Sequence, residues 1–206
     1  MKYIQTIAII LSVGIITAFA QTNSEINKNE IFGGFSFSKS IKDTNLFIVL
    51  AQKQNQLFHG SNFSFTRNFN RFFGVKFQTA QIKRNVKIVI DTNHYFVNQS
   101  TASFLGGVQI KDNLKEKRFR PFGHALVGAA RNKQLVGKDP CPAGTANCQF
   151  PEIKENKIVL NFGGGMDIKL NKNVSLRAIQ VDYQYNRTTI LPKNSLFFST
   201  GININF

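Results

Sequence analysis

The final stretch of the chain, residues 194–206, shows a pattern that recurs along most of the sequence. From Phe198 to Phe206 every second residue is apolar, aromatic or threonine, and the residues between them are small or polar. The small or polar set is Ser199, Gly201, Asn203 and Asn205. Successive side chains of a β-strand point to opposite faces, so a period of two predicts a strand with one apolar and one polar face.

The same alternation predicts seven further strands, and thus an all-β chain of eight strands. They cover residues 31–38, 60–67, 73–80, 100–111, 118–130, 157–170 and 174–185. Long connections at 39–57, 83–99 and 132–156, with a shorter one at 186–193, alternate with short turns near 68–71, 112–117 and 171–173. An even strand number with alternating long loops and short turns is typical of outer-membrane barrels. We therefore predict an eight-stranded antiparallel transmembrane β-barrel. Residues 83–99 also alternate, which leaves open that strands continue there beyond the membrane.

One hairpin is specific enough to predict its register. Pairing centred on the turn 171–173 places Leu170 opposite Val174 and Met166 opposite Ala178 on the apolar face. On the polar face it places Asp167 opposite Arg177, and cross-strand pairs of this kind stabilise sheets. Beyond Ala178 the polar and apolar positions exchange, which predicts a β-bulge.

The first residues have the features of an export signal. A single Lys2 precedes an apolar run that ends near Phe19, and Ala18-Phe19-Ala20 resembles a cleavage site. The run is shorter than the ~20 residues of a spanning helix. We predict a cleaved signal peptide at 1–20 and one barrel domain at 21–206.

Two cysteines lie in the last long connection. Cys141 and Cys148 are separated by a Pro- and Gly-containing segment, and two close cysteines in an exported chain predict a disulfide. A metal site needs more ligands than these, and no histidine is near them in sequence.

The strongly basic balance of the chain points to anionic partners. There are 26 Lys and Arg against 11 Asp and Glu, for a formal net charge of +15. In an exported chain the expected anions are the phosphates of lipopolysaccharide and of other outer-membrane lipids. The basic residues are dispersed and no nucleic-acid-binding motif is present, so nucleic acid is not a predicted partner.

Five ionisable residues are predicted to face the barrel interior. They are Arg120, His124, Asp167, Arg177 and Asp182. Eight strands leave an interior just wide enough for side chains, and unpaired charges there are costly. We interpret the five as a structural polar network of the lumen rather than as a catalytic set or an ion path. The triple glycine at 163–165 lacks the spacing and the following helix of a phosphate loop, and is better explained by close packing inside a narrow barrel.

No arrangement of residues predicts catalysis or a cofactor. His59 and His94 lie near predicted external connections, with Ser61, Asp91 and Ser100 close in sequence. Their spacing is not that of a nucleophile, base and acid set. The chain is therefore predicted not to be an enzyme, with no cofactor and no metal.

Several segments together resemble a known family. They are Ala18-Phe19-Ala20, I-F-G-G-F-S-F from Ile31, P-F-G-H-A-L-V-G-A-A at Pro121–Ala130, F-G-G-G-M-D-I-K-L at Phe162–Leu170, V-S-L-R-A-I-Q-V-D-Y at Val174–Tyr183 and S-T-G-I-N-I-N-F at Ser199–Phe206. The chain resembles the OmpA/OmpX-like eight-stranded outer-membrane barrels, without the peptidoglycan-binding domain. The resemblance implies a monomer in a bacterial outer membrane, with Phe206 as the aromatic residue that the barrel assembly machinery reads.

The expected role is structural or interactive. It combines membrane integrity with loop-mediated binding of lipopolysaccharide or another partner. A narrow diffusion pore is the main alternative, and a lipid A-modifying enzyme is a second one.

Overall fold

The structure, a computed structural model, describes residues 26–42, 58–90, 93–114, 116–138, 151–186 and 194–206. The predicted signal peptide at 1–20 and the predicted disulfide of Cys141 and Cys148 lie outside these residues. Those two assignments therefore stay predictions.

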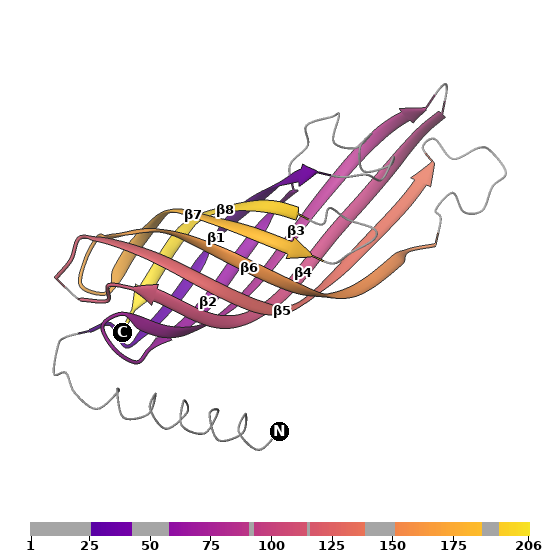
Figure 1. The fold of residues 1–206 in the computed structure, drawn as a ribbon. Coiled ribbons are helices and arrows are strands. Elements are labelled where there is room, and N and C mark those ends of the chain that lie inside the picture. The colour runs from indigo at the N-terminus through magenta and orange to yellow at the C-terminus, as the bar shows by residue number, and fades with distance from the viewer. Residues whose placement is uncertain (1–25, 43–57, 91–92, 115, 139–150, 187–193) are drawn as a thin grey trace, which may run out of the picture.

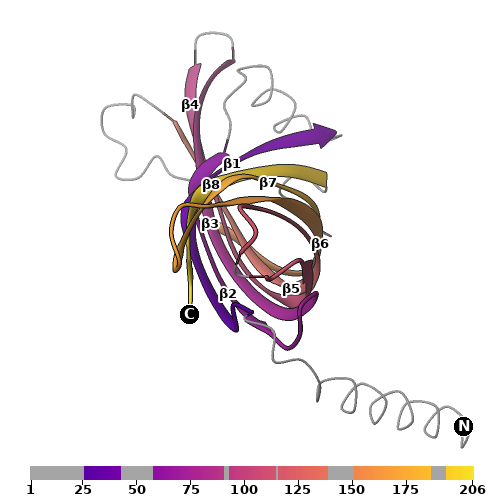
Figure 2. The same cartoon turned by 90° about the vertical axis from the view of Figure 1, so that its left-hand side faces the viewer.

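Eight antiparallel strands close into one barrel, as the alternation predicts (Figures 1 and 2). The strands are β1 (Asn29–Lys42), β2 (Phe58–Asn68), β3 (Phe73–Ile90), β4 (Asn93–Lys111), β5 (Phe119–Lys138), β6 (Ile153–Lys169), β7 (Val174–Asn186) and β8 (Asn194–Asn205). Each strand pairs with its neighbours in sequence, and β1 pairs with β8 to close the sheet. Closure leaves no sheet edge along the paired rows, which is the condition for strands to cross a bilayer.

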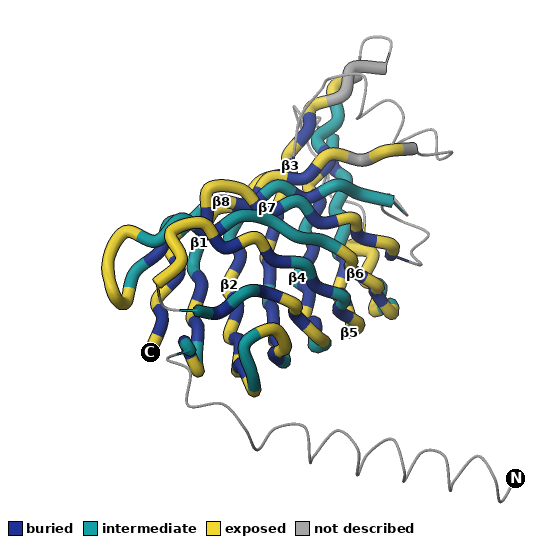
Figure 3. Tube along the Cα trace, turned by 60° about the vertical axis from the view of Figure 1, so that its left-hand side comes forward, coloured by how far each residue is buried: buried dark blue, intermediate teal, exposed yellow. Residues whose placement is uncertain are grey.

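The two faces of the sheet differ in the predicted sense, and buried and exposed residues alternate along each strand (Figure 3). On β8, Ile202 and Ile204 point outward and are 44% and 47% exposed, whereas Ser199, Asn203 and Asn205 point inward and are buried. The outward apolar side chains form a belt around the barrel. The belt includes Ile31, Phe35, Phe63, Phe65, Phe77, Phe104, Val108, Val127, Ile158, Phe162, Ile202 and Ile204.

Almost all of the predicted connection at 83–99 is strand, which is the outcome that its alternation left open. The β3–β4 ladder continues from Lys83↔Ser100 to Ile90↔Asn93, and the two strands extend past the first residue of β2 (Figure 1). Val86 and Val97 are buried in this extension and pack against Val136 of β5. This small apolar cluster gives the extension a core of its own. Residues 132–138 and 153–156 of the predicted long connection at 132–156 are likewise strand.

The β6–β7 hairpin has the predicted register near its turn and a bulge one step earlier than expected. Asp167 pairs with Arg177 as predicted, but Met166 pairs with Ile179 instead of Ala178. Ala178 and Ile179 are both exposed, so the bulge takes up one extra residue on the outer face. Beyond it the residues at 180, 182 and 184 point inward, which explains the change of parity in the sequence.

Polar side chains fix the short turns. The Oδ1 atom of Asn171 accepts hydrogen bonds from the backbone N–H groups of Asn173 and Val174, at 2.9 and 2.8 Å. Asp112 accepts two hydrogen bonds from Arg71, at 3.0 and 3.1 Å, which join two neighbouring turns. The Arg71 guanidinium holds the pKa of the Asp112 carboxyl well below its usual range.

One inward glycine is required by a neighbouring side chain. A Cβ atom added to Gly163 would lie 2.0 Å from Oδ1 of Asp182 and 2.6 Å from the carbonyl oxygen of Val181. Gly123 points outward on the adjacent strand, and the nearest atom to its added Cβ is 3.8 Å away. Gly163 therefore leaves the space in which Asp182 enters the lumen.

These two glycines give a matched test of the packing. We expect Gly163→Ala to destabilise the barrel by about 1–3 kcal/mol, as overpacking does in other well-packed interiors. Gly123→Ala should leave the urea midpoint almost unchanged. Both are measured by urea unfolding in lipid vesicles, followed by the gel migration of unboiled samples. Equal midpoints for the two variants would contradict the assigned packing.

Candidate functional site

A buried ion pair lies in the lumen near the short-turn end of β6 and β7, and it is the central pair of a larger network. Asp167 of β6 accepts hydrogen bonds from Arg177 of β7, with Nε to Oδ1 at 2.8 Å and Nη2 to Oδ2 at 3.1 Å. Both side chains are at most 1% exposed. The two parallel contacts form the bidentate geometry that makes Arg–carboxylate pairs both strong and directional.

The guanidinium of Arg177 is also held between two aromatic rings. Its Cζ atom lies 4.3 Å from the ring centroid of Phe32 and 4.2 Å from that of Phe122. Phe32 belongs to β1 and Phe122 to β5, so the cation connects parts of the wall that are not neighbours in the sheet. Cation–π contacts of desolvated guanidinium groups add to the stability of such a cluster.

A second cation and a second acid extend the pair across the barrel. Lys111 Nζ lies 2.6 Å from Glu30 Oε2 and 2.7 Å from Asp167 Oδ2. The amide of Asn203 donates to the same two carboxylate oxygens, at 3.0 and 3.2 Å. These contacts tie β1, β4, β6 and β8 together through side chains.

A branch of the network leads from Arg177 to His124. Arg177 Nη1 donates to Gln180 Oε1 at 2.8 Å, and Gln180 Nε2 donates to Asp182 Oδ2 at 2.6 Å. His124 Nε2 lies 3.0 Å from Asp182 Oδ1, and Lys76 Nζ lies 3.4 Å from His124 Nδ1.

Arg120 joins the network through polar neutral side chains. Its Nη2 donates to Ser175 Oγ, which also accepts from Asn205 Nδ2 at 3.1 Å. Asn203 Nδ2 donates to Asn205 Oδ1 at 3.3 Å and so returns to the central pair. All five residues that the sequence assigns to the lumen are buried here and are linked through such contacts.

Three charged members of this cluster, Glu30, Lys76 and Lys111, were not selected from the sequence. Each lies at an inward position of its strand, since Lys76 alternates with the outward Phe77 and Lys111 follows the outward Ile110. The alternation in the sequence could therefore have identified them as lumen residues.

An apolar layer lies further along the lumen from this network. Leu105, Leu126, Ala130 and Val159 pack together and are at most 4% exposed. Beyond it, Arg84 donates to Gln99 Oε1 at 2.6 Å and lies 4.3 Å from the ring centroid of Phe58. Buried polar and apolar side chains thus follow one another along the described part of the lumen.

Outward-facing cations gather on the end of the barrel away from the short turns. The paired positions Lys83↔Ser100, Ser100↔Lys133 and Lys133↔Lys154 form one row across β3 to β6, and His59 pairs with Lys83 at its other end. Glu152 lies 2.7 Å from Lys154 and 3.8 Å from Lys133. A hydrogen bond from Lys154 holds the pKa of Glu152 below its ordinary value, and Lys133 and Arg131 contribute to the same shift.

Within the described residues, no group of three or more His, Cys, Asp or Glu side chains is arranged to hold a metal ion. In the same part of the chain, no helix is long and apolar enough to cross a membrane. His59 and His94 are both exposed on the outer face, and Asp91 lies outside the described residues.

Comparisons with known proteins support the fold. No protein-family model and no curated protein sequence matches the chain. Among solved structures, the attachment invasion locus protein Ail of Yersinia pestis superimposes with a TM-score of 0.55 at 16% identity, over 86% of this chain and 97% of that one. Ail in complex with the heparin analogue sucrose octasulfate gives 0.53 at 18% identity, with the same coverage. The chain therefore has the fold of the eight-stranded outer-membrane barrels, and the resemblance seen in the sequence is confirmed at the level of the fold.

The central pair predicts a large effect of a small change. Asp167→Asn keeps the shape of the side chain but leaves Arg177 and Lys111 with less compensating charge. Removing one partner of a buried ion pair costs about 3–5 kcal/mol, and we expect a loss of that order in urea unfolding.

The matched control is Glu152→Gln, which removes a carboxylate that also lies between two cations, Lys154 and Lys133, but on the outer surface. It should shift the urea midpoint only slightly, since exposed ion pairs contribute little. If both variants unfold at the wild-type midpoint, the central pair does not stabilise the barrel.

Proposed function

We propose that the protein is an integral outer-membrane barrel that does not conduct, and that its outer rim binds lipopolysaccharide. In this role it stabilises the membrane and presents its external connections to the surroundings. The observation that carries the proposal is the row of outward cations at the end of the barrel opposite the short turns.

The arrangement of the wall supports this role. The apolar belt matches a hydrocarbon environment, and outer-membrane barrels place short turns in the periplasm and long connections outside. The cationic row then lies at the outer boundary, where the phosphates of lipopolysaccharide are found. Arg131, Lys133 and Lys154 surround a single acid, Glu152, so this part of the rim keeps a positive surplus.

A structural neighbour supports the class of partner. The structure of Ail in complex with sucrose octasulfate, a heparin analogue, shows a polyanion together with a barrel of this fold. Phosphate groups of lipopolysaccharide and sulfate groups of such an analogue are both recognised through charge-assisted contacts with Lys and Arg.

The proposal includes the route to the membrane. Export through a cleaved signal at 1–20, assembly as a monomer, and recognition of Phe206 by the barrel assembly machinery stay predictions. Phe206 is 58% exposed on the outward parity, and its backbone N–H and C=O bond to Asn29. Its ring is thus accessible while its backbone completes the closing pair.

Neutralising part of the rim tests the binding of lipopolysaccharide. We expect R131Q/K133Q, which leaves the contact between Glu152 and Lys154 in place, to weaken binding roughly thirtyfold at low salt. Each Lys or Arg near an anionic surface contributes about 1 kcal/mol to the binding free energy, and the variant removes two. Binding is measured by surface plasmon resonance of the folded barrel in detergent on immobilised lipopolysaccharide.

The matched control for this experiment is K28Q/K172Q, which removes two exposed cations at the turn end. It should bind like the wild type. Equal losses for both double variants would show a general charge effect and overturn the assignment of the rim.

Planar bilayer recording separates the proposal from a narrow diffusion pore. Because the ion-pair network and the apolar cluster both project into the narrow lumen, we expect no steady single-channel steps at moderate salt. Steady steps from folded wild-type protein would replace the proposal by the pore.

A further inference from the structure

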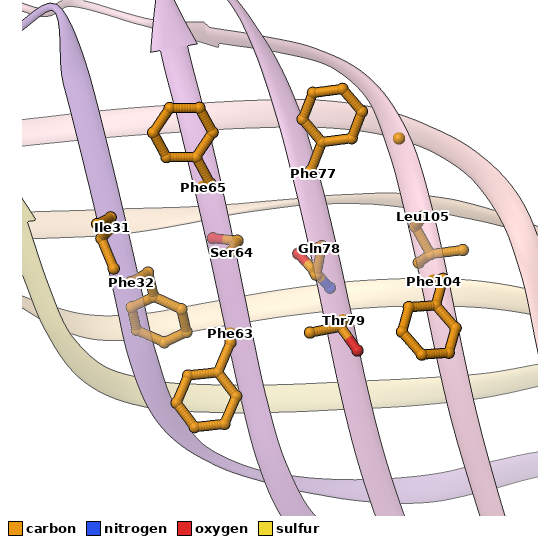
Figure 4. Close-up of a pocket in the computed structure, with 11 residues that line it drawn as sticks. Ile31, Phe32, Phe63, Ser64, Phe65, Phe77, Gln78, Thr79, Phe104 and Leu105 are labelled. Carbon is orange, nitrogen blue, oxygen red and sulfur yellow. The ribbon is translucent and has the colours of Figure 1, made fainter.

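The lipid-facing wall carries an apolar groove over β1 to β4. It has a volume of about 660 Å³ and is lined mainly by outward side chains of these four strands. Figure 4 shows the rings of Phe63, Phe65, Phe77 and Phe104 around it, with Thr79 between Phe63 and Phe104.

The hollow arises from an alternation of large and small residues across neighbouring strands. One transverse row runs Phe63↔Thr79↔Phe104, and the adjacent row runs Phe65↔Phe77↔Gly106. A Cβ atom added to Gly106 would lie 3.4 Å from the ring of Phe77, so that ring leans over the glycine. The small side chains at Thr79 and Gly106 thus leave a depression beside the larger aromatic rings.

Lys83 of the cationic row and its ladder partner His59 lie further along the same strands. Lys83 follows Thr79 by four residues on β3, and His59 precedes Phe63 by four on β2; the two are paired in the ladder and exposed. Four residues of strand span about 13 Å. Among the described residues, no carboxylate lies within ion-pairing distance of Lys83.

We propose that the groove holds one acyl chain of a lipid A molecule whose phosphate is bound by His59 and Lys83. The occupant is hydrocarbon because the groove lies within the apolar belt. One leaflet contributes about 15 Å, half of a hydrocarbon core of about 30 Å, so a chain whose head group lies at Lys83 reaches the groove. The inference rests on the proposed binding of lipopolysaccharide and adds a second contact region, distinct from Arg131 and Lys133.

Because the sequence contains no tryptophan, the fluorescence of a single introduced tryptophan reports on one chosen position. Phe104 at the groove and Ile158 outside it lie in one transverse row, through Ala129, and are 67% and 70% exposed. Single F104W and I158W variants are folded into phosphatidylcholine vesicles with brominated chains, which quench tryptophan. Unbrominated lipid A is then added in small mole fractions.

We expect lipid A to relieve quenching in F104W at least fivefold more efficiently than in I158W. The excess is the additional relief of quenching in F104W relative to I158W. In the F104W background, Thr79→Phe fills the groove and should abolish this excess, and Lys83→Gln should reduce it severalfold. Ala129→Phe, which also introduces a phenyl ring but outside the groove, should leave it unchanged. Lipid A without phosphates should show little excess. Gel migration of unboiled samples verifies folding of every variant, and Lys83→Gln tests the proposal if Thr79→Phe does not fold.

Other outcomes would overturn the inference in identifiable ways. Equal relief in F104W and I158W would show that no site exists. An equal excess with phosphatidylglycerol would assign the groove to phospholipid chains in general. If quenching of F104W instead falls as the protein-to-lipid ratio rises, a second copy of the chain covers the groove. If K83Q and T79F bind immobilised lipopolysaccharide normally and lipid A relieves quenching no more in F104W than in I158W, the groove is not a lipid A site, while the proposed function stands. If the wild-type protein does not bind immobilised lipopolysaccharide at all, the proposed function itself is wrong.

Discussion

The buried pair of Asp167 and Arg177 is the interaction on which the interior depends. An eight-stranded barrel has no room for water-filled space around each charge, so a cation that enters must find its compensation among neighbouring side chains. Arg177 obtains it from one carboxylate and two aromatic faces. The bulge at Ala178 belongs to the same solution, because it lets residues 177 and 180 both point inward, where Arg177 Nη1 donates a hydrogen bond to Gln180 Oε1. Without that extra residue, the parity of β7 would place Gln180 and Asp182 on the outer face.

The outer wall follows the opposite rule. Its solvent is hydrocarbon, so aromatic and branched side chains are stable there while exposed, and the backbone can satisfy its polar groups only through a closed ladder. The β1–β8 pairing and the mutual backbone bonds of Asn29 and Phe206 complete that ladder at the turn end. Inward glycines such as Gly163 then allow bulky polar groups to enter a lumen of small diameter.

The sequence predicts the part of this structure that depends on local order. Period-two alternation identifies all eight strands and their faces, and the short turn at 171–173 fixes the pairing of Asp167 with Arg177. It leaves open whether 83–99 is strand, since alternation alone cannot show how far a partner strand continues. Nor does it predict the contact of Lys111 with Glu30, which are 81 residues apart. Which inward side chains meet across the lumen is set by the tilt and stagger of the closed barrel, a property of all eight strands together.

The division between inside and outside also decides what the net charge means. Lys76, Arg84, Lys111, Arg120 and Arg177 are buried in the lumen, so none of them can attract an external polyanion. The cations available for the proposed binding are those with outward parity at the end of the belt, where Lys83, Lys133 and Lys154 share one transverse row. A lipid with phosphates on a rigid head group and chains directed into the belt is complementary to this surface in both charge and polarity. A soluble polyanion would use only the charged row, whereas the proposed lipid ligand would also use the aromatic groove beneath it.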